Sequence, residues 1–429
     1  MSATLSSSAL EKRLKACRAA ARALRQADAT KKNTVLYRAA ELLAQKQKEL
    51  LKANAADLRA LGKKSTPAFK DRLTITEARI GHMAESLRQV AELSDPVGEE
   101  VEAFTLPNGL NVRRVRSPLG VIYMIFESRP NVAIEAFSLG FKSGNVMILR
   151  GGKESMKTTA VLYSILQQSL KENGLSTDCL WGVTSPDRKL AHALLQQKKW
   201  IDVVVPRGGD GLIEFVTKHS QIPVIKNDRG LCHIYVHEDA NLDMALGIVE
   251  NAKVQRPGVC NSMETLLVHR SVSAEFLTRL YDRISTEDSP HTVYWYGDRD
   301  TLKILKGQER IKAATPKSWD TEYLDYKMNC RVVDSLDEAI EHIETHGSRH
   351  SEAIITASSE TARTFEQEVD AAAVYWNGST RFTDGFELGL GGELGISTQK
   401  LHVRGPVGLR ELTSVRWIIE GQGQVRQSK

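Results

Sequence analysis

The 429-residue sequence is poor in cysteine, and its cysteines follow no disulfide or metal-binding pattern. The five, which lie far apart and outside any CxxC or CxxH pair, are Cys17, Cys179, Cys232, Cys260 and Cys330. Disulfide frameworks and zinc sites both need cysteines in matching numbers or at short defined spacings. The pattern therefore predicts free thiols, no metal site and a reducing, cytoplasmic environment.

Long apolar runs and concentrated charge are also missing. No window approaches the roughly 20 apolar residues that a transmembrane helix needs. The arginine-rich N-terminus contains Glu11 and lacks the apolar core of a signal peptide, so we expect it to be a surface helix of the mature fold. The 58 basic and 53 acidic residues are spread along the chain, without a basic tract interleaved with aromatics. This distribution argues against a nucleic-acid partner.

Hydrophobic periodicity divides the chain into a helical beginning and two α/β parts. Residues 9–62 have apolar residues at helical spacing, which predicts two long amphipathic helices, and the helical pattern continues over residues 71–93. From Pro118 onwards, apolar strands alternate with helices of about a dozen residues. A second part of this kind begins at His233. The predicted fold class is α/β, with a parallel, doubly wound sheet.

Two alternating segments interrupt this order and predict a β-hairpin. Residues 101–106 and 110–115 are separated by Pro107-Asn108-Gly109, and Asn-Gly between alternating runs is a strong hairpin signal. Residues 412–420 predict a final strand near the end of the chain. Because these strands carry few large apolar residues, we expect them to pair with another chain or domain.

One cysteine stands at a predicted turn between a helix and a strand. The segment NAKVQRPGVCNSMETLLV (residues 251–268) begins as a helix, which should end at Arg256-Pro257-Gly258 because proline lacks an N–H and glycine tolerates unusual dihedrals. Cys260 follows, and residues 265–268 predict a strand. A thiol at such a turn can be exposed beside unpaired N–H groups, as a nucleophile requires. The alternative is a buried, inert cysteine that packs as a small hydrophobic residue.

Two other joints between strand and helix are rich in glycine. They are RGGKE at residues 150–154 and PRGGD at residues 206–210. Each could hold phosphate oxygens on N–H groups at a helix start, assisted by the adjacent arginine or lysine. Neither is a GxGxxG motif, so a tight turn without a ligand is an equal alternative.

Four longer stretches are specific enough to indicate a family. They are FESRPN (residues 126–131), VCNSMET (259–265), THGSRHSEAI (345–354, preceded by DEAI at 337–340) and GISTQKLHVRGPVGL (395–409). In wording and order they resemble the γ-glutamyl phosphate reductase (glutamate-5-semialdehyde dehydrogenase) family of the aldehyde dehydrogenase superfamily, over nearly the whole chain.

The resemblance implies an aldehyde-dehydrogenase-like architecture with three parts. An NADP(H)-binding domain would comprise residues 1–100 and 117–230, and a catalytic domain bearing Cys260 would comprise residues 231–400. The remaining segments, residues 101–116 and 405–429, would form an oligomerisation arm.

The resemblance also implies roles for single residues. Cys260 falls at the position of the superfamily's nucleophile. Arg150 replaces the lysine that holds the adenosine ribose, and Lys153 follows three residues later; two cations there fit a 2′-phosphate and favour NADP(H). Gly208 and Gly209 match the pyrophosphate turn. Glu322 matches the glutamate that binds the nicotinamide ribose, the alternative being an ordinary surface glutamate before a strand.

Two departures from the superfamily pattern bear on the chemistry. The segment ELGGK, whose glutamate activates a water, corresponds to KNDRG at residues 226–230, which has no carboxylate at that position. Hydrolysis of a thioester needs that base, whereas its reduction does not. The superfamily's oxyanion-binding asparagine has no direct counterpart. Asn131 is the candidate donor, and the alternative is a helix cap, a role for which Ser128 competes.

The sequence thus predicts an NADPH-dependent reduction of L-glutamyl 5-phosphate to L-glutamate 5-semialdehyde and phosphate through a Cys260 thioester, the second step of proline biosynthesis from glutamate. The alternatives are a hydrolytic NAD(P)-dependent aldehyde dehydrogenase acting on a small aldehyde, and a non-enzymatic scaffold that partners a kinase. We expect a homodimer or larger assembly. A transient glutamate kinase is the expected protein partner, because channelling would protect a labile acyl phosphate.

Overall fold

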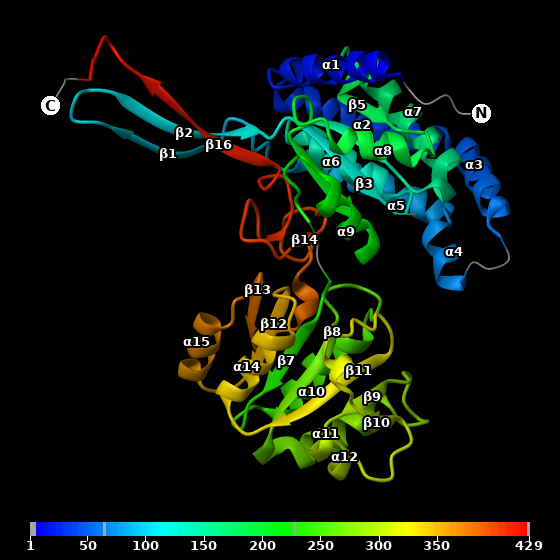
Figure 1. Cartoon of the computed structure of the whole chain (residues 1–429), viewed down its shortest axis with the longest axis vertical. Helices are drawn as coiled ribbons and strands as arrows, with labels where there is room; N and C mark the ends of the chain where they lie inside the picture. Colours follow the sequence, from blue (N-terminus) through cyan, green and yellow to red (C-terminus); the bar gives the residue numbers. More distant parts are fainter. Residues whose placement is uncertain (1–5, 63–65, 128, 227–228, 427–429) are drawn as a thin grey trace. The chain divides into compact units, whose positions relative to one another are not determined.

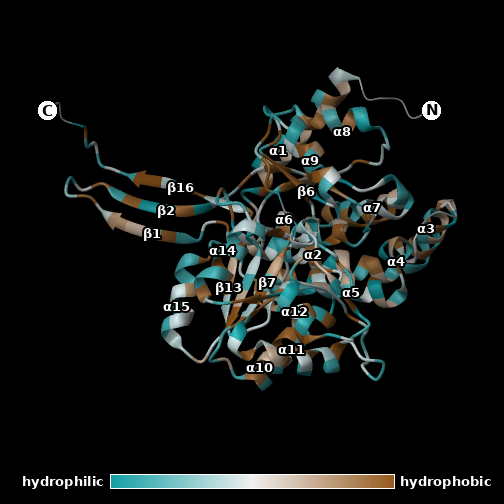
Figure 2. Cartoon of the chain, turned by 60° about the horizontal axis from the view of Figure 1, so that its bottom comes forward, coloured by the Kyte–Doolittle hydropathy of each residue, from teal (hydrophilic) through white to brown (hydrophobic). Residues whose placement is uncertain are grey.

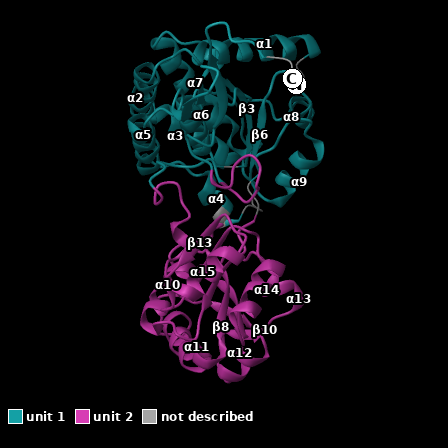
Figure 3. Cartoon of the chain, turned by 90° about the vertical axis from the view of Figure 1, so that its left-hand side faces the viewer, with its two compact units in different colours: residues 1–226, 389–395, 407–429 teal, residues 227–388, 396–406 magenta. Residues whose placement is uncertain are grey.

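The computed structural model of the chain describes residues 6–62, 66–127, 129–226 and 229–426. Its internal contacts divide the chain into two units (Figure 3). Unit 1 comprises residues 1–226, 389–395 and 407–429, and unit 2 comprises residues 227–388 and 396–406. Over the described ranges, no helix combines the length and the apolar character that crossing a membrane requires.

Unit 1 begins with five helices, α1 (Ser7–Leu24), α2 (Ala29–Gln45), α3 (Gln47–Ala60), α4 (Pro67–Leu73) and α5 (Glu77–Glu92). The prediction of two long helices over residues 9–62 was wrong, because the chain breaks twice in this span. The Asp28 carboxylate accepts a hydrogen bond from the Lys31 N–H and starts α2. Lys46 leaves the helical conformation (φ −99°, ψ 16°) and separates α2 from α3.

The core of unit 1 is a four-stranded parallel sheet in the order β5-β4-β3-β6. Figure 1 labels two of its strands, β3 and β5. Its strands are β3 (Val121–Phe126), β4 (Val146–Arg150), β5 (Leu180–Gly182) and β6 (Val203–Arg207). The segments around them contain α6 (Val132–Lys142), η1 (Lys153–Ser155), α7 (Met156–Glu172), η2 (Thr177–Cys179), α8 (Arg188–Leu195) and α9 (Asp210–His219). All six residues of β3 are buried, as expected of a strand covered on both faces.

Unit 2 contains a seven-stranded parallel sheet in the order β10-β9-β11-β8-β7-β12-β13. The strands are β7 (Cys232–Val236), β8 (Met263–His269), β9 (Tyr294–Gly297), β10 (Ile311–Ala313), β11 (Lys327–Val333), β12 (Ser351–Ile355) and β13 (Ala373–Trp376). The helices are α10 (Leu242–Val254), α11 (Arg270–Ile284), α12 (Arg299–Ile304), α13 (Pro316–Trp319), α14 (Leu336–His346), α15 (Ser359–Glu368) and η3 (Thr380–Phe382). Strands β14 (Ile396–Ser397) and β15 (Gly405–Pro406) form a separate pair.

Helices cover both faces of this sheet, which confirms the predicted α/β class. Leu266 and Val268 of β8 pack with residues of α10 and α11 in one core cluster. Leu267, which points to the opposite face, packs with residues of α14 and α15 in another. The two clusters explain why residues 266–268 are all apolar, since both faces of β8 are covered and its first six residues are buried.

The predicted hairpin is present, and the late strand joins it. Strands β1 (Glu100–Thr105), β2 (Asn111–Pro118) and β16 (Thr413–Glu420) form an antiparallel sheet with β2 in the middle. Gly109 has a φ of +84° at the tip, which favours glycine there. Apolar and polar residues both lie along these strands (Figure 2). Val112 and Val115 of β2 are buried, but Phe104, Trp417 and Ile419 are 40%, 56% and 60% exposed, so the sheet leaves large apolar side chains in contact with solvent.

Candidate functional site

The turn that carries Cys260 forms where a helix ends and a central strand begins. Helix α10 ends at Val254 and β8 begins at Met263, with Pro257 and Gly258 in the turn between them. Cys260 is half-buried, whereas the other four cysteines are buried. Burial raises the pKa of Cys17 and of Cys179 to about 12, so those two thiols are poor nucleophiles. Of the five thiols, Cys260 alone combines access with a position on a turn.

Side chains from η3 and the residues after it hold this turn. The Asn261 amide donates to the carbonyl oxygen of Thr383 at 2.8 Å and to that of Arg381 at 3.3 Å. In return, the Thr380 hydroxyl donates to the carbonyl oxygen of Asn261 at 2.8 Å. These bonds join segments about 120 residues apart and fix the backbone next to the thiol.

The backbone at Gly230 lies directly against Cys260. A Cβ at Gly230 would lie 1.6 Å from the Cys260 carbonyl oxygen, so no other residue fits without moving the turn. The Gly230 N–H donates to Oε1 of Glu322 at 2.9 Å. Glu322 is half-buried and is therefore not a plain surface residue. Within unit 2 the structure brings together Cys260, Glu322 and the end of the KNDRG segment, of which residues 227–228 lie outside the described ranges.

A buried ion pair supports the Glu322 segment, and sequence reasoning missed it. Lys253 and Glu264 are 0% and 1% exposed, and their charged atoms lie 3.2 Å apart. The Glu264 carboxylate also accepts from the N–H of Leu324, whose φ is +51°, an unusual value for a leucine. Burial raises the pKa of Glu264 to about 7, and the Lys253 charge opposes that shift. The sequence did contain a signal for this pair, because Lys253 and Glu264 each lie within a largely apolar segment.

A second missed group contacts the Cys260 backbone. The Cys232 thiol donates to the carbonyl oxygen of Cys260 at 3.2 Å and lies 3.6 Å from Nδ1 of His350. The same nitrogen lies 2.9 Å from the Ser351 hydroxyl. Cys232 and His350 are 0% exposed, and burial lowers the pKa of His350 to about 4. This buried group therefore supports the Cys260 carbonyl in an uncharged state near neutral pH.

In unit 1 the predicted cofactor residues, and with them the predicted oxyanion donor Asn131, follow the carboxyl ends of three adjacent strands. Asn131 comes after β3, Arg150 ends β4 with Lys153 three residues on, and Gly208-Gly209 follows β6. Parallel strands present these ends at one edge of the sheet, where ligands bind in doubly wound folds. The connections from β3 and β6 lead to opposite sides, so this edge also includes the point at which strand order reverses.

The glycine turn after β6 already interacts with a carboxylate. The Gly209 N–H, at the start of α9, donates to Oε2 of Glu127 at 3.1 Å. A Cβ at Gly208 would lie 2.6 Å from the same side chain. An anionic group is therefore accommodated at this turn, and only glycine lets it approach so closely. These residues fit the pyrophosphate of a dinucleotide, provided that the exposed Glu127 side chain moves aside.

The two cations proposed for the ribose end are both accessible to a ligand. Arg150 is half-buried and makes one long hydrogen bond, from Nη2 to the Pro186 carbonyl oxygen at 3.4 Å. Lys153 is exposed in η1. Neither forms an ion pair among the described residues, so their charges are available to a phosphate.

Asn131 occupies the first position before α6, but it is not a conventional cap. Its side chain forms no hydrogen bond to the helix backbone. Instead its Nδ2 donates to Oε1 of Glu135 at 2.7 Å. Ser128, the competing cap, lies outside the described residues. The oxyanion role of Asn131 stays a prediction.

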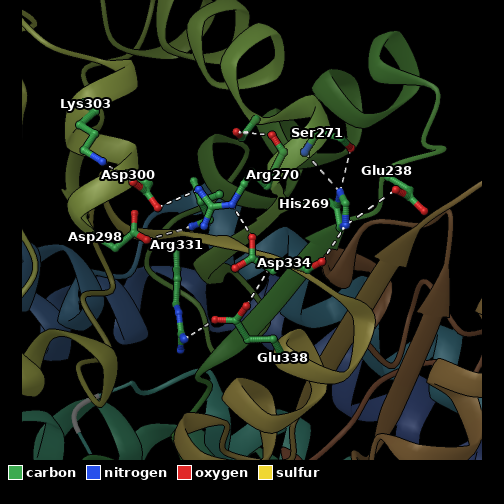
Figure 4. Close-up of polar contacts among 12 residues, drawn as sticks. Glu238, His269, Arg270, Ser271, Asp298, Asp300, Lys303, Arg331, Asp334 and Glu338 are labelled. Carbon is green, nitrogen blue, oxygen red and sulfur yellow. Dashed lines mark hydrogen bonds and ion pairs between the residues drawn. The ribbon is translucent and has the colours of Figure 1, made fainter.

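At the carboxyl end of β8, away from Cys260, charged side chains form a network of ion pairs. Arg270, directly after β8, pairs with Asp300 at 2.8 Å and with Asp334 (Figure 4). On the same edge, Arg331 pairs with Glu338 at 2.6 Å. The charges of this edge are therefore neutralised within the protein. Cys260 precedes β8 and Arg270 follows it, so Cys260 and this network lie at different ends of one strand.

Comparisons with known proteins show which proteins this chain is similar to. The Aldehyde dehydrogenase family profile matches residues 2–289. The γ-glutamyl phosphate reductase of Halothermothrix orenii is 48% identical over 92% of this chain and 93% of its own. The crystal structure of the γ-glutamyl phosphate reductase from Thermotoga maritima is 40% identical, covers 97% of this chain and 100% of its own, and superposes with a TM-score of 0.93. An engineered glycolyl-CoA reductase with bound NADP+ shares the fold alone, at 15% identity and a TM-score of 0.68.

The buried His350 generates a prediction about acid stability. Its pKa is 6.5 when unperturbed and about 4 in the folded protein, so the unfolded chain binds the extra proton between these values. The free energy of unfolding should therefore fall as the pH is lowered from about 6.5 to 4, by about 2–3 kcal/mol for this group. A His350→Asn variant should lack this part of the pH slope in urea unfolding measured at pH 4, 5, 6 and 7. Equal slopes in both proteins would contradict the assignment.

Proposed function

Because the chain belongs to the γ-glutamyl phosphate reductase family of the aldehyde dehydrogenases, we propose that Cys260 carries its reaction through a thioester. The reaction is the reduction of L-glutamyl 5-phosphate to L-glutamate 5-semialdehyde and phosphate, in the biosynthesis of proline from glutamate. The observation that carries the proposal is the turn itself, which leaves Cys260 half-buried and places its backbone against Gly230, whose N–H donates to Glu322.

In the first half of the reaction, the Cys260 thiolate attacks the carbonyl carbon of the acyl phosphate. A C–S bond forms, and the tetrahedral oxyanion collapses as the C–O bond to phosphate breaks and phosphate leaves. We propose the Cys260 N–H and the Asn131 side chain as donors to that oxyanion. A donor of this kind contributes about 3 kcal/mol in other enzymes.

The second half needs a nicotinamide cofactor, which, when bound, supplies the hydride that converts the thioester to the aldehyde and restores the thiolate. We propose that Gly208 and Gly209 hold its pyrophosphate and that Glu322 holds the nicotinamide ribose. Arg150 and Lys153 are proposed to hold a 2′-phosphate, which makes NADPH the preferred form. Two observations support this assignment. Neither Arg150 nor Lys153 forms an ion pair among the described residues, and the Gly209 N–H already donates to a carboxylate, that of Glu127.

The residues at 226–230 favour reduction over hydrolysis. The residue at the position of the water-activating glutamate is Lys226. A thioester on Cys260 therefore has no carboxylate base at this position to direct a water against it. This absence protects the intermediate until it is reduced and sets the chain apart from a hydrolytic aldehyde dehydrogenase.

We also propose a homodimer or larger assembly built through the β1-β2-β16 sheet. Neither β1 nor β16 pairs with a second strand in the part of the chain that is described, and Trp417 and Ile419 are more than half exposed. Strand edges of this kind commonly pair with another chain. Five free cysteines support a place in the reducing cytoplasm, where a transient glutamate kinase would supply the labile substrate.

The nucleophile is tested by Cys260→Ala and Cys260→Ser. Both variants should lose more than 99% of turnover, because a serine hydroxyl without an adjacent base is a poor nucleophile. NADPH binding, measured by fluorescence titration, should stay within about twofold. A variant that keeps a tenth of the activity would exclude the thioester mechanism.

Cofactor choice is tested by the double variant Arg150→Gln/Lys153→Gln. Each charge-assisted contact is worth about 1.5–3 kcal/mol, so KM for NADPH should rise at least tenfold while KM for NADH changes little. Lys171→Gln, at the far end of the helix that follows, is the control and should alter neither. Equal losses for both cofactors would show that the pair does not read the 2′-phosphate.

The arm is tested by replacing residues 102–114 with a short glycine linker. The shortened chain should sediment as a monomer with reduced activity, because it lacks the β1-β2 hairpin through which the sheet is proposed to pair with another chain. The intact protein should sediment as a dimer or larger at micromolar concentration. An intact monomer under those conditions would rule the assembly out.

A further inference from the structure

One arginine, Arg381, contacts the turn around Cys260 without an ion pair to any carboxylate in the described part of the chain. Arg381 lies in η3 and is half-buried. Its Nε donates to Oε1 of Gln255 at 2.9 Å, and its Nη1 donates to Oδ1 of Asn261, the residue next to Cys260. Both acceptors are neutral amide oxygens. Hydrogen bonds from two of its nitrogens thus fix the orientation of the guanidinium. No direct ion pair with a described residue neutralises its charge.

A second arginine, Arg256, lies near Arg381. Burial is the main cause that lowers the pKa of Arg381, and the charge of the nearby Arg256 lowers it further. Asp384, Cys260 and Glu387 act in the opposite direction from a distance. Arg256 is exposed in the turn and has no ion pair among the described residues. Arg381 and Arg256 therefore both lack a direct counterion among the residues that the structure describes.

The arginine at the other end of β8 shows what a structural arginine looks like in this unit. Arg270 contacts both Asp300 and Asp334 and is exposed (Figure 4). Its contacts raise its pKa, as expected when carboxylates stabilise the charged form. Arg381 is more buried, and its side chain donates only to amide oxygens among the described residues. Its positive charge therefore has no evident structural role in this unit.

Holding the nucleophile turn does not require the Arg381 charge. The Asn261 side-chain amide already donates to the carbonyl oxygens of Arg381 and Thr383. The Thr380 hydroxyl donates to the carbonyl oxygen of Asn261. These bonds would remain with another side chain at position 381. A guanidinium with free donor capacity is, in contrast, the group that best fits a planar or tetrahedral oxyanion.

We propose that Arg381, assisted by Arg256, forms an anion subsite beside Cys260 that binds a charged oxygen group of the substrate. The inference rests on the proposed acyl-phosphate reaction. The substrate offers two such groups, the phosphate that leaves and the α-carboxylate, and the same two enter separately when the reaction is run backwards. In that direction each group can be varied alone.

The test uses the intact enzyme with NADP+, inorganic phosphate and the semialdehyde, added as its cyclic imine. For Arg381→Met we expect the KM for one of the two anionic reactants to rise about 10- to 100-fold. A rise for phosphate assigns the subsite to the leaving group. A rise for the semialdehyde, with the uncharged butanal oxidised at the wild-type rate in a single turnover, assigns it to the α-carboxylate.

Two outcomes would overturn the proposal. Unchanged KM values for both anions would show that no substrate charge binds Arg381. An equal loss with butanal and with the semialdehyde would show that the side chain only positions the turn. Arg270→Met is the matched control and should leave both KM values unchanged. If the wild-type protein itself shows no phosphate-dependent turnover, the proposed function fails instead, so the two failures are distinguishable.

Discussion

The contact between the Gly230 backbone and the Cys260 carbonyl is the constraint on which the rest of the unit 2 site depends. A Cβ would lie 1.6 Å from that oxygen, so the two backbones touch only because residue 230 is a glycine. The same Gly230 N–H holds the Glu322 carboxylate at 2.9 Å. One close approach therefore sets both the position of the nucleophile and that of the residue proposed to bind the nicotinamide ribose.

Buried polar groups make this arrangement rigid. Lys253 and Glu264 flank the turn in sequence, and Glu264 also binds the backbone of Leu324, two residues after Glu322. Cys232 holds the carbonyl of Cys260 from β7. Breaking a buried pair by removing one partner leaves an uncompensated charge, which is strongly destabilising. These buried contacts thus hold the backbone around Cys260 in place, and moving it would cost a large part of the folding free energy.

Charge is distributed differently at the two ends of the unit 2 sheet. At the carboxyl edge, arginines and carboxylates neutralise one another, as Arg270 does with Asp300 and Asp334. Near Cys260, Arg381 is held by amides and keeps its charge for a ligand. This difference agrees with an anionic acyl phosphate as substrate and with a nucleophile that acts as a thiolate.

Local patterns in the sequence predicted what depends on neighbouring residues. The α/β class, the hairpin around Asn108-Gly109 and the turn at Cys260 were all readable, because periodicity, proline and glycine act over a few positions. Gly230 and Arg381 were missed as parts of the site, since each contacts Cys260 or Asn261 from a segment 30 or 120 residues away. His350 was missed because it reaches Cys260 only through the Cys232 thiol. The helix break at Lys46 was missed because no proline or glycine marks it.

The central claim, a thioester that is passed to phosphate rather than to water, is tested most directly by running the wild-type enzyme backwards with and without phosphate. With the semialdehyde and NADP+ alone, the account predicts a burst of about one NADPH per Cys260 and then no further formation, because the acyl group stays on the thiol. Phosphate should restore continuous turnover and yield the acyl phosphate. Continuous NADPH formation without phosphate would show that water cleaves the thioester and would contradict the account.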